Sequence, residues 1–174
     1  MKRLLSMLGV TALLFCLAAI AYAQGQARGA AKLELKGQTV SVDYGQPALN
    51  GRTVQQLIGQ LKPGDVWRLG SNKSTTFSTG TDLVFGDVTV PKGEYSLWAR
   101  KEADGGWKLV FNKQHGQWGT QHDAAQDLAA APLTETKASK SAEQVTISLE
   151  KAGDGGTITI QWGDMLLSAN FAAK

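Results

Sequence analysis

The chain has 174 residues, with 18 Lys and Arg against 15 Asp and Glu. Lys2 and Arg3 lie in an N-terminal segment that we expect to be removed, which leaves 16 basic residues against 15 acidic ones. This near balance gives no electrostatic reason to expect nucleic acid or an anionic membrane as a partner. The single cysteine, Cys16, lies in the same segment. The mature chain therefore excludes disulfides, Cys-ligated zinc and a thiol nucleophile.

The N-terminus has the pattern of a secretory signal peptide. A basic start is followed by an apolar run over residues 4–20 and then by Ala21-Tyr22-Ala23. Small residues at positions −3 and −1 are what signal peptidase accepts, so we predict cleavage after Ala23 and removal of residues 1–23. The alternative is an uncleaved transmembrane anchor, because a bilayer is crossed by about 20 apolar residues. Cleavage implies export to the periplasm or out of the cell.

The rest of the chain predicts a single domain rich in strands. Residues 24–31 are small and polar, which favours a flexible lead-in, and residues 32–174 are of a length typical of one domain. Apolar and polar residues alternate over residues 33–43, the pattern of half-buried strands. Further strands are predicted at residues 66–69, 74–79, 83–85, 88–90, 95–100, 107–111, 128–136, 144–150, 158–162 and 165–171. We expect Pro132 to interrupt its strand, and the last three strands to form two closing hairpins.

Only one helix is expected, over residues 53–58, where Thr53 can cap its start and Gly59 its end. About ten short strands separated by polar turns indicate an all-β fold. We predict an antiparallel β-sandwich or jelly roll with at most one or two short helices, and a closed barrel is the alternative.

No motif in the sequence marks a reaction. The glycines form neither a phosphate loop nor a dinucleotide fingerprint, and no serine sits in a Gly-x-Ser-x-Gly elbow. A hydrolase that uses Asp, Glu or His of the loop 115–127 stays open, because catalytic residues meet in space and not in sequence. Metal ligation is also an alternative there, but the spacing matches no ligand signature, so we predict no metal and no cofactor. The metal alternative would use His115, His122, Asp123 and Asp127.

Two residues stand out from the strand pattern. Trp118 lies between glycines in a loop-like segment, where an exposed indole suits stacking on a sugar or another flat ligand, or else anchors its own loop. Arg68 lies in an apolar run and must find a partner if it is buried. It either pairs with a carboxylate such as Asp43 or Asp123, or faces an anionic ligand.

Several short motifs occur in one order along the chain. They are Val42-Asp43-Tyr44-Gly45-Gln46-Pro47 with Gly51-Arg52, Val66-Trp67-Arg68 with Gly70, Asn72 and Thr75-Thr76, Val90-Pro91-Lys92-Gly93-Glu94-Tyr95-Ser96-Leu97, Asn112-Lys113-Gln114 with Gly116-Gln117-Trp118-Gly119-Thr120, and Trp162-Gly163-Asp164. Together they resemble a bacterial domain-of-unknown-function family, DUF 2911, over nearly all of the mature chain. The resemblance implies an exported protein of about this size without an assigned activity.

We therefore interpret the chain as a non-enzymatic, exported β-domain that binds a small or carbohydrate-like ligand or a partner in the cell envelope. A hydrolase and a purely structural envelope protein without a pocket are the alternatives, and the oligomeric state is left open. The candidate ligand-binding residues are Arg68, Asn72, Trp118 and Asp123. The candidate members of a structural polar network are Asp43, Tyr44, Arg52 and Trp67.

Overall fold

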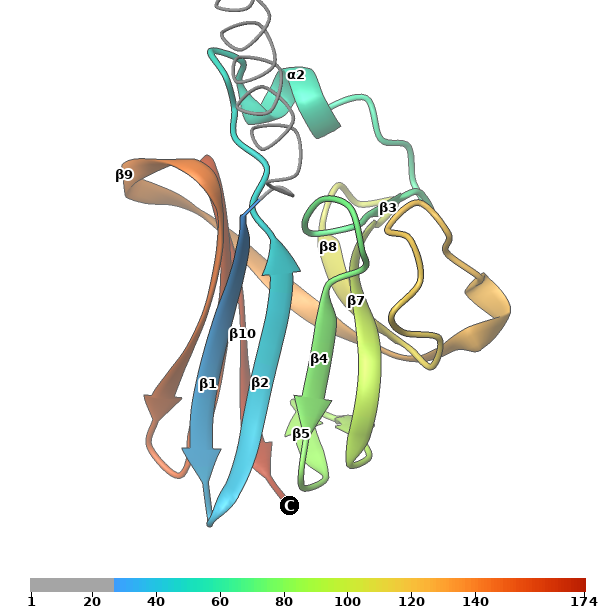
Figure 1. The fold of residues 1–174 in the computed structure, drawn as a ribbon, viewed down its shortest axis with the longest axis vertical. Coiled ribbons are helices and arrows are strands. Elements are labelled where there is room, and N and C mark those ends of the chain that lie inside the picture. Colours follow the sequence, from blue (N-terminus) through green and yellow to red (C-terminus); the bar gives the residue numbers. More distant parts are fainter. Residues whose placement is uncertain (1–26) are drawn as a thin grey trace, which may run out of the picture.

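The computed structural model describes residues 27–174, which form one continuous sheet of ten antiparallel strands and one short α-helix (Figure 1). The strand order is β1-β2-β4-β7-β8-β9-β10-β5-β6, and the short strand β3 pairs with β7. The all-β fold predicted from the sequence is confirmed. The order ends in two edges, β1 and β6, and does not close into a ring. The elements are β1 (Arg28–Leu35), β2 (Gln38–Gly45), α2 (Val54–Ile58), β3 (Val66–Trp67), β4 (Thr76–Thr79), β5 (Leu83–Phe85), β6 (Val88–Val90), β7 (Gly93–Lys101), β8 (Trp107–Asn112), the 3-10 helix η1 (Ala124–Gln126), β9 (Asp127–Ala152) and β10 (Gly155–Ala173).

The long strand β9 belongs to both halves of the sheet. It pairs with β8 as far as Leu133 and with β10 from Thr134 onward. The second half packs behind the first, because β1 contacts β9 and β10 across the fold (Figure 1). Phe85 of β5 contacts both Phe111 of β8 and Phe171 of β10, each with ring centroids 5.1 Å apart. One apolar core therefore lies between the two halves.

The first strand begins earlier than the sequence predicts. β1 starts at Arg28, inside the range 24–31 that the composition assigns to a flexible lead-in. Residues 28–31 pair with residues 42–45 of β2. A Cβ atom at Gly29 would lie 2.5 Å from Cζ of Tyr44, so the small residues of β1 let the Tyr44 ring lie against the strand. The small residues of this segment suggested a mobile lead-in, but in the structure they allow close packing against β2.

Two interruptions predicted from the sequence are wrong. β9 runs unbroken through Pro132, which lies opposite Lys108 of β8. Proline is tolerated there because β9 has a single neighbouring strand at this point, so one side of its backbone makes no ladder bonds. Likewise β10 is one strand, and Gly163 (φ +57°) makes a bulge in place of the turn that two closing hairpins require.

The short helix α2 matches its prediction. Thr53 caps it, in a capping box with Gln56, and Gly59 is its C-cap. The helix lies beyond the end of β2, on the connection that leads to β3 (Figure 1). Its buried residue Val54 contacts the bulge of β10, because a Cβ atom at Gly163 would lie 2.9 Å from Cγ2 of Val54. The bulge thus forms the surface on which the helix packs.

The predicted signal peptide, residues 1–23, lies outside the described residues and stays a prediction. Within residues 27–174, no helix has the length and apolarity needed to cross a bilayer.

The contact between α2 and the bulge gives a testable prediction. Gly163→Ala places a Cβ atom in left-handed backbone and against Val54, so the free energy of unfolding should fall by about 2–4 kcal/mol. Gly153→Ala is the matched control, because Gly153 has φ +58° but nothing near its added Cβ atom. It should lose only about 1–2 kcal/mol. Urea unfolding followed by circular dichroism measures both, and equal losses would contradict the proposed contact.

Candidate ligand-binding site

A cavity of about 350 Å³ lies between α2, the end of β3 and the loop that follows β8. Aliphatic side chains from α2 and its flanks form one part of its wall, and three tryptophans form another. Arg68 is the single charged residue that residues 27–174 contribute to the wall. The cavity is lined by Pro47, Leu57, Ile58, Leu61, Val66, Trp67, Arg68, Gly70, Trp98, Gly119, Thr120 and Trp162.

Two of the tryptophans stack on each other. The rings of Trp67 and Trp162 are 5.7 Å apart between centroids and inclined by 10°. Trp67 comes from β3 and Trp162 from β10, so the stack joins the two halves of the sheet at the cavity. Nε1 of Trp162 is buried and has no hydrogen-bond partner among the described residues. The stack provides a flat apolar part of the cavity wall.

The third tryptophan, Trp98, is held by polar groups on the outer face of β7. Its Nε1 donates a hydrogen bond to Oγ of Ser96 (2.9 Å). The His122 ring packs against the Trp98 indole, with centroids 4.8 Å apart. Trp98 is 2% exposed although it belongs to the face of β7 opposite to the main core, because the loop of residues 113–126 covers it. The loop thereby fixes one wall of the cavity.

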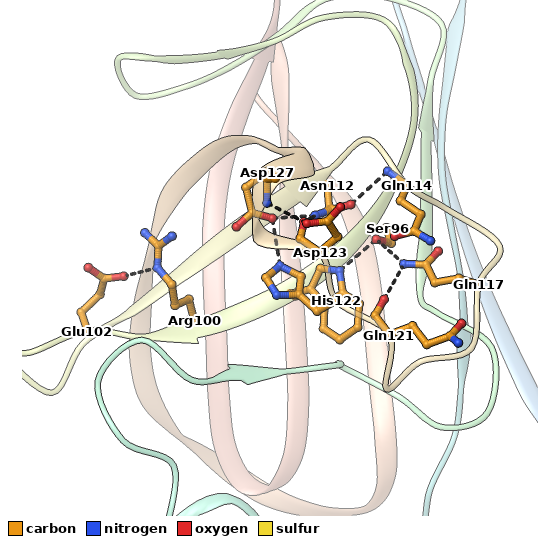
Figure 2. A network of polar contacts seen from close by, with 12 residues as sticks. Ser96, Arg100, Glu102, Asn112, Gln114, Gln117, Gln121, His122, Asp123 and Asp127 are labelled. Carbon is orange, nitrogen blue, oxygen red and sulfur yellow. Dashed lines mark hydrogen bonds and ion pairs between the residues drawn. The ribbon is translucent and has the colours of Figure 1, made fainter.

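The covering loop is itself fixed by a polar network around β8 (Figure 2). Asn112, fully buried at the end of β8, donates from Nδ2 to Oδ1 of Asp127 (2.7 Å) and to the backbone oxygen of Asp123 (2.8 Å). Nε2 of His122 lies 2.9 Å from the same Oδ1 of Asp127. Gln117 reaches back to β7, where its Nε2 donates to Oγ of Ser96 (3.3 Å). Buried polar groups that satisfy one another in this way hold a loop in one conformation.

Arg68 enters the cavity wall where the backbone leaves β3 in an unusual conformation. Leu69 has φ +54° and is fully buried, and Asn72 has φ +61°. Left-handed backbone costs a leucine roughly 1–2 kcal/mol, so the surrounding packing must impose it. Thr75 supports the segment by donating from Oγ1 to the backbone oxygen of Leu69 (3.2 Å). The segment 68–72 is thus a strained connection held by its neighbours.

The structure forms neither of the ion pairs expected for Arg68. Asp43 pairs with Arg28 of β1. Asp123 uses its carboxylate to cap η1, accepting from the backbone nitrogen of Ala125 (3.0 Å). Within residues 27–174, the Arg68 guanidinium makes no hydrogen bond and no ion pair. The expectation of a structural carboxylate partner is therefore wrong, because both proposed partners are engaged elsewhere.

Gly119 lets the covering loop pack onto the Arg68 segment. Its backbone nitrogen donates to the backbone oxygen of Asn72 (2.7 Å). A Cβ atom at Gly119 would lie 2.8 Å from that oxygen and 3.2 Å from Cδ of Arg68. The absence of a side chain therefore brings the loop against the aliphatic part of Arg68.

The four predicted ligand-binding residues do not all meet. Arg68 lines the cavity, but the other three candidates are not among its lining residues. Trp118 is 52% exposed and bridges to Lys73 through its backbone. Asn72 supports the loop through its backbone oxygen, and Asp123 is exposed at η1. Of this set, the structure brings only Arg68 to the cavity.

The four residues assigned to a structural polar network make separate contacts. Asp43 pairs with Arg28, and the buried Tyr44 lies against Gly29. Arg52 donates from Nε to the backbone oxygen of Leu49 (3.0 Å). Trp67 stacks on Trp162. No hydrogen bond joins these four residues to one another in the part of the chain described.

The two histidines have different partners. His115 lies near Glu94, with Nδ1 3.7 Å from Oε2, whereas His122 pairs with Asp127. No group of three His, Cys, Asp or Glu residues suited to a metal occurs within residues 27–174. A His–Asp pair also orients the base of a catalytic triad, but no serine or threonine hydroxyl is hydrogen-bonded to His122 among these residues. The contacts of His122 are those of a loop anchor.

Two side chains outside the cavity have shifted pKa values. Burial raises the pKa of Tyr95, and the negative charge of Asp82 adds to the rise. The hydrogen bond from Arg100 lowers the pKa of Glu102, with the charges of Arg100 and Lys108 acting in the same direction (Figure 2). Neither group lines the cavity, so these shifts belong to structural contacts.

Sequence reasoning missed most of the cavity wall. Trp98 and Trp162 occupy strand positions at which an apolar residue is most simply assigned to the core. Leu57, Ile58 and Leu61 belong to a short helix and the turn after it, and nothing in their pattern shows what they face.

The fold and the cavity define a class of protein: a small all-β domain with a ligand-sized cavity whose wall includes three tryptophans. The family model described as "Protein of unknown function (DUF2911)" matches residues 26–171, and the chain belongs to this family. The predicted resemblance is thus confirmed. No curated protein and no solved structure matches the chain.

The backbone role of Asn72 gives a second prediction. Asn72→Gly keeps the left-handed conformation without strain, so stability should stay within about 0.5 kcal/mol. Asn72→Ala should lower the free energy of unfolding by about 1 kcal/mol, because alanine tolerates this conformation poorly. Urea unfolding of both variants measures the difference. Equal losses in the two variants would instead assign the effect to the amide side chain.

Proposed function

We propose that this protein is a binding domain that holds one small molecule with an apolar body in the cavity beneath α2. The observation that carries the proposal is the wall itself: three tryptophans and several aliphatic side chains around about 350 Å³. Small-molecule sites are typically apolar clefts of about 300–1,000 Å³ with few polar groups. The hydrogen-bonded loop and the strained segment at Leu69 keep this space from collapsing.

The wall formed by α2 and its flank is the part of the cavity best able to adjust to a ligand. Leu57, Ile58 and Leu61 are half-buried, and α2 is only five residues long. A helix of this length is held by its packing and not by its own hydrogen bonds. The opposite walls belong to the sheet and to the fixed loop. The cavity is already partly open to solvent, so a ligand can enter without a large rearrangement of α2.

A neutral dye tests this proposal. The purified protein should bind one molecule of N-phenyl-1-naphthylamine per chain, with quenching of tryptophan fluorescence and a rise in dye emission. Leu57→Trp fills the cavity and should weaken binding at least about tenfold, because a packed space has no room for both groups. Fluorescence titration and calorimetry measure affinity and stoichiometry.

Gln60→Trp is the matched control. Gln60 is exposed just after α2 and does not line the cavity, so this variant should bind as the wild type does. Circular dichroism and the melting temperature establish that both variants fold. Absence of saturable binding to the wild type, or unchanged binding to Leu57→Trp, contradicts a ligand site in this cavity.

We also propose that the protein acts outside the cytoplasm after cleavage behind Ala23. The arrangement of β1 supports this, because the first strand starts at Arg28 and cleavage would remove none of its residues. Mass spectrometry of the exported protein should find Gln24 as its first residue. Ala23→Arg should block processing, because a large charged residue does not suit position −1. Gln26→Arg is the control, and an exported chain that begins at Met1 refutes cleavage.

A further inference from the structure

We infer that the cavity selects an organic anion: a carboxylate bound by Arg68, attached to a compact apolar body that packs against the tryptophans. This inference deepens the proposed function and rests on it. It names the chemical class of the ligand, which the apolar wall alone does not define.

The charge of the cavity wall favours an anionic ligand. Among the described residues 27–174, Arg68 is the single charged residue of the wall, and no Asp or Glu of that range lines the cavity. The Arg68 side chain is half-buried and makes no hydrogen bond or ion pair within residues 27–174. A cation in a largely apolar site is stabilised by a counter-charge in the same site. An anionic group on the ligand supplies that charge, whereas a cationic group would be repelled.

The geometry of the arginine side chain favours a carboxylate as the anionic group. The guanidinium is planar and offers paired N–H donors, which match the two oxygens of a carboxylate. The approach of Gly119 to Cδ of Arg68 holds the aliphatic part of the side chain in place. The strained, fully buried Leu69 fixes the backbone directly after it. Strain of this kind persists where the surrounding structure imposes a position, and it gathers at binding sites.

The tryptophans of the wall favour an apolar body attached to the anionic group. A flat or compact apolar body can pack on the Trp67–Trp162 stack, and Trp98 also lines the cavity. Arg68 belongs to the same wall and supplies the hydrogen-bond donors. A ligand with both an apolar body and an acceptor-rich head fits this combination. A neutral hydrocarbon would leave Arg68 without a partner.

Two dyes with the same ring system test the inference. 8-Anilinonaphthalene-1-sulfonate carries one negative charge, and N-phenyl-1-naphthylamine is the same molecule without the sulfonate. We expect the wild type to bind the anionic dye at least about tenfold more tightly. Calorimetry should give one site per chain, and the difference should shrink as salt is added. Equal affinities for the two dyes overturn the inference while leaving the proposed function in place.

Arg68→Gln is the diagnostic variant. It should weaken the anionic dye at least about tenfold and change the affinity of the neutral dye by no more than about twofold. Lys62→Gln removes the same charge from an exposed residue next to the wall residue Leu61, and it should leave both affinities unchanged. Equal weakening of both dyes by Arg68→Gln, or the same loss in Lys62→Gln, overturns a direct contact with the anion.

Arg68→Lys keeps the result interpretable if Arg68→Gln does not fold. It should retain a preference for the anionic dye, but a smaller one, because an ammonium group lacks the paired donors. The comparison of the two dyes on the wild type does not depend on any variant. If neither dye binds the wild type, the proposed function and this inference fail together.

Matched acids and amides then test the head group. Naphthalene-2-carboxylate should displace the anionic dye at a concentration about tenfold or more below that of naphthalene-2-carboxamide. Decanoate and decanamide form the same comparison for a chain-like body. A preference for the acid in either pair supports the inference and identifies the body that fits. Equal competition by acid and amide in both pairs overturns it.

Discussion

The stack of Trp67 on Trp162 is the contact on which the site depends. It ties β3, which pairs with one half of the sheet, to β10, which belongs to the other half. Two indoles with centroids 5.7 Å apart bury a large apolar area, and aromatic pairs contribute about 0.5–1.5 kcal/mol beyond that burial. The same rings form a cavity wall, so the contact that joins the halves also shapes the binding surface.

Glycines at close approaches place the other walls around this stack. Gly163 makes the bulge that follows Trp162 and leaves room for Val54, so α2 can sit above the end of the sheet. Gly119 does the same for the loop that packs on Arg68. In each case a Cβ atom would collide with a neighbour, which explains why α2 and the loop lie so close to the residues they pack on.

The polar residues divide into two groups by what they contact. Asn112, Asp127 and His122 form one hydrogen-bonded group, and Gln117 bonds to Ser96. Together these contacts hold the loop over Trp98. Arg68 has no such partner in the described chain. A satisfied network fixes structure, whereas a single unpaired cation in an apolar wall is a feature that a ligand can complete. This contrast is why we assign recognition to Arg68 and support to the histidine network.

The helix caps, the alternation and most of the strands were predicted from local signals, because capping and period-2 burial depend on residues near one another in the chain. The start of β1, the passage through Pro132 and the unbroken β10 were missed, since each depends on a neighbouring strand or side chain. For the site, the sequence marked Arg68 as a residue in need of a partner but named the wrong carboxylates. Ion pairing depends on distance in space. In the fold, Asp43 lies beside Arg28, and this proximity cannot be read from the sequence.

By itself, the sequence determined an all-β domain, a single short α-helix within residues 27–174 and membership of its family. Composition and short-range periodicity are enough for such properties. Only the tertiary structure decided which tryptophans enclose a cavity and which residue brings a charge to it. An alternating pattern tells which side chains are buried. It does not tell whether they meet another side chain or an open space, because that depends on segments far apart in the chain.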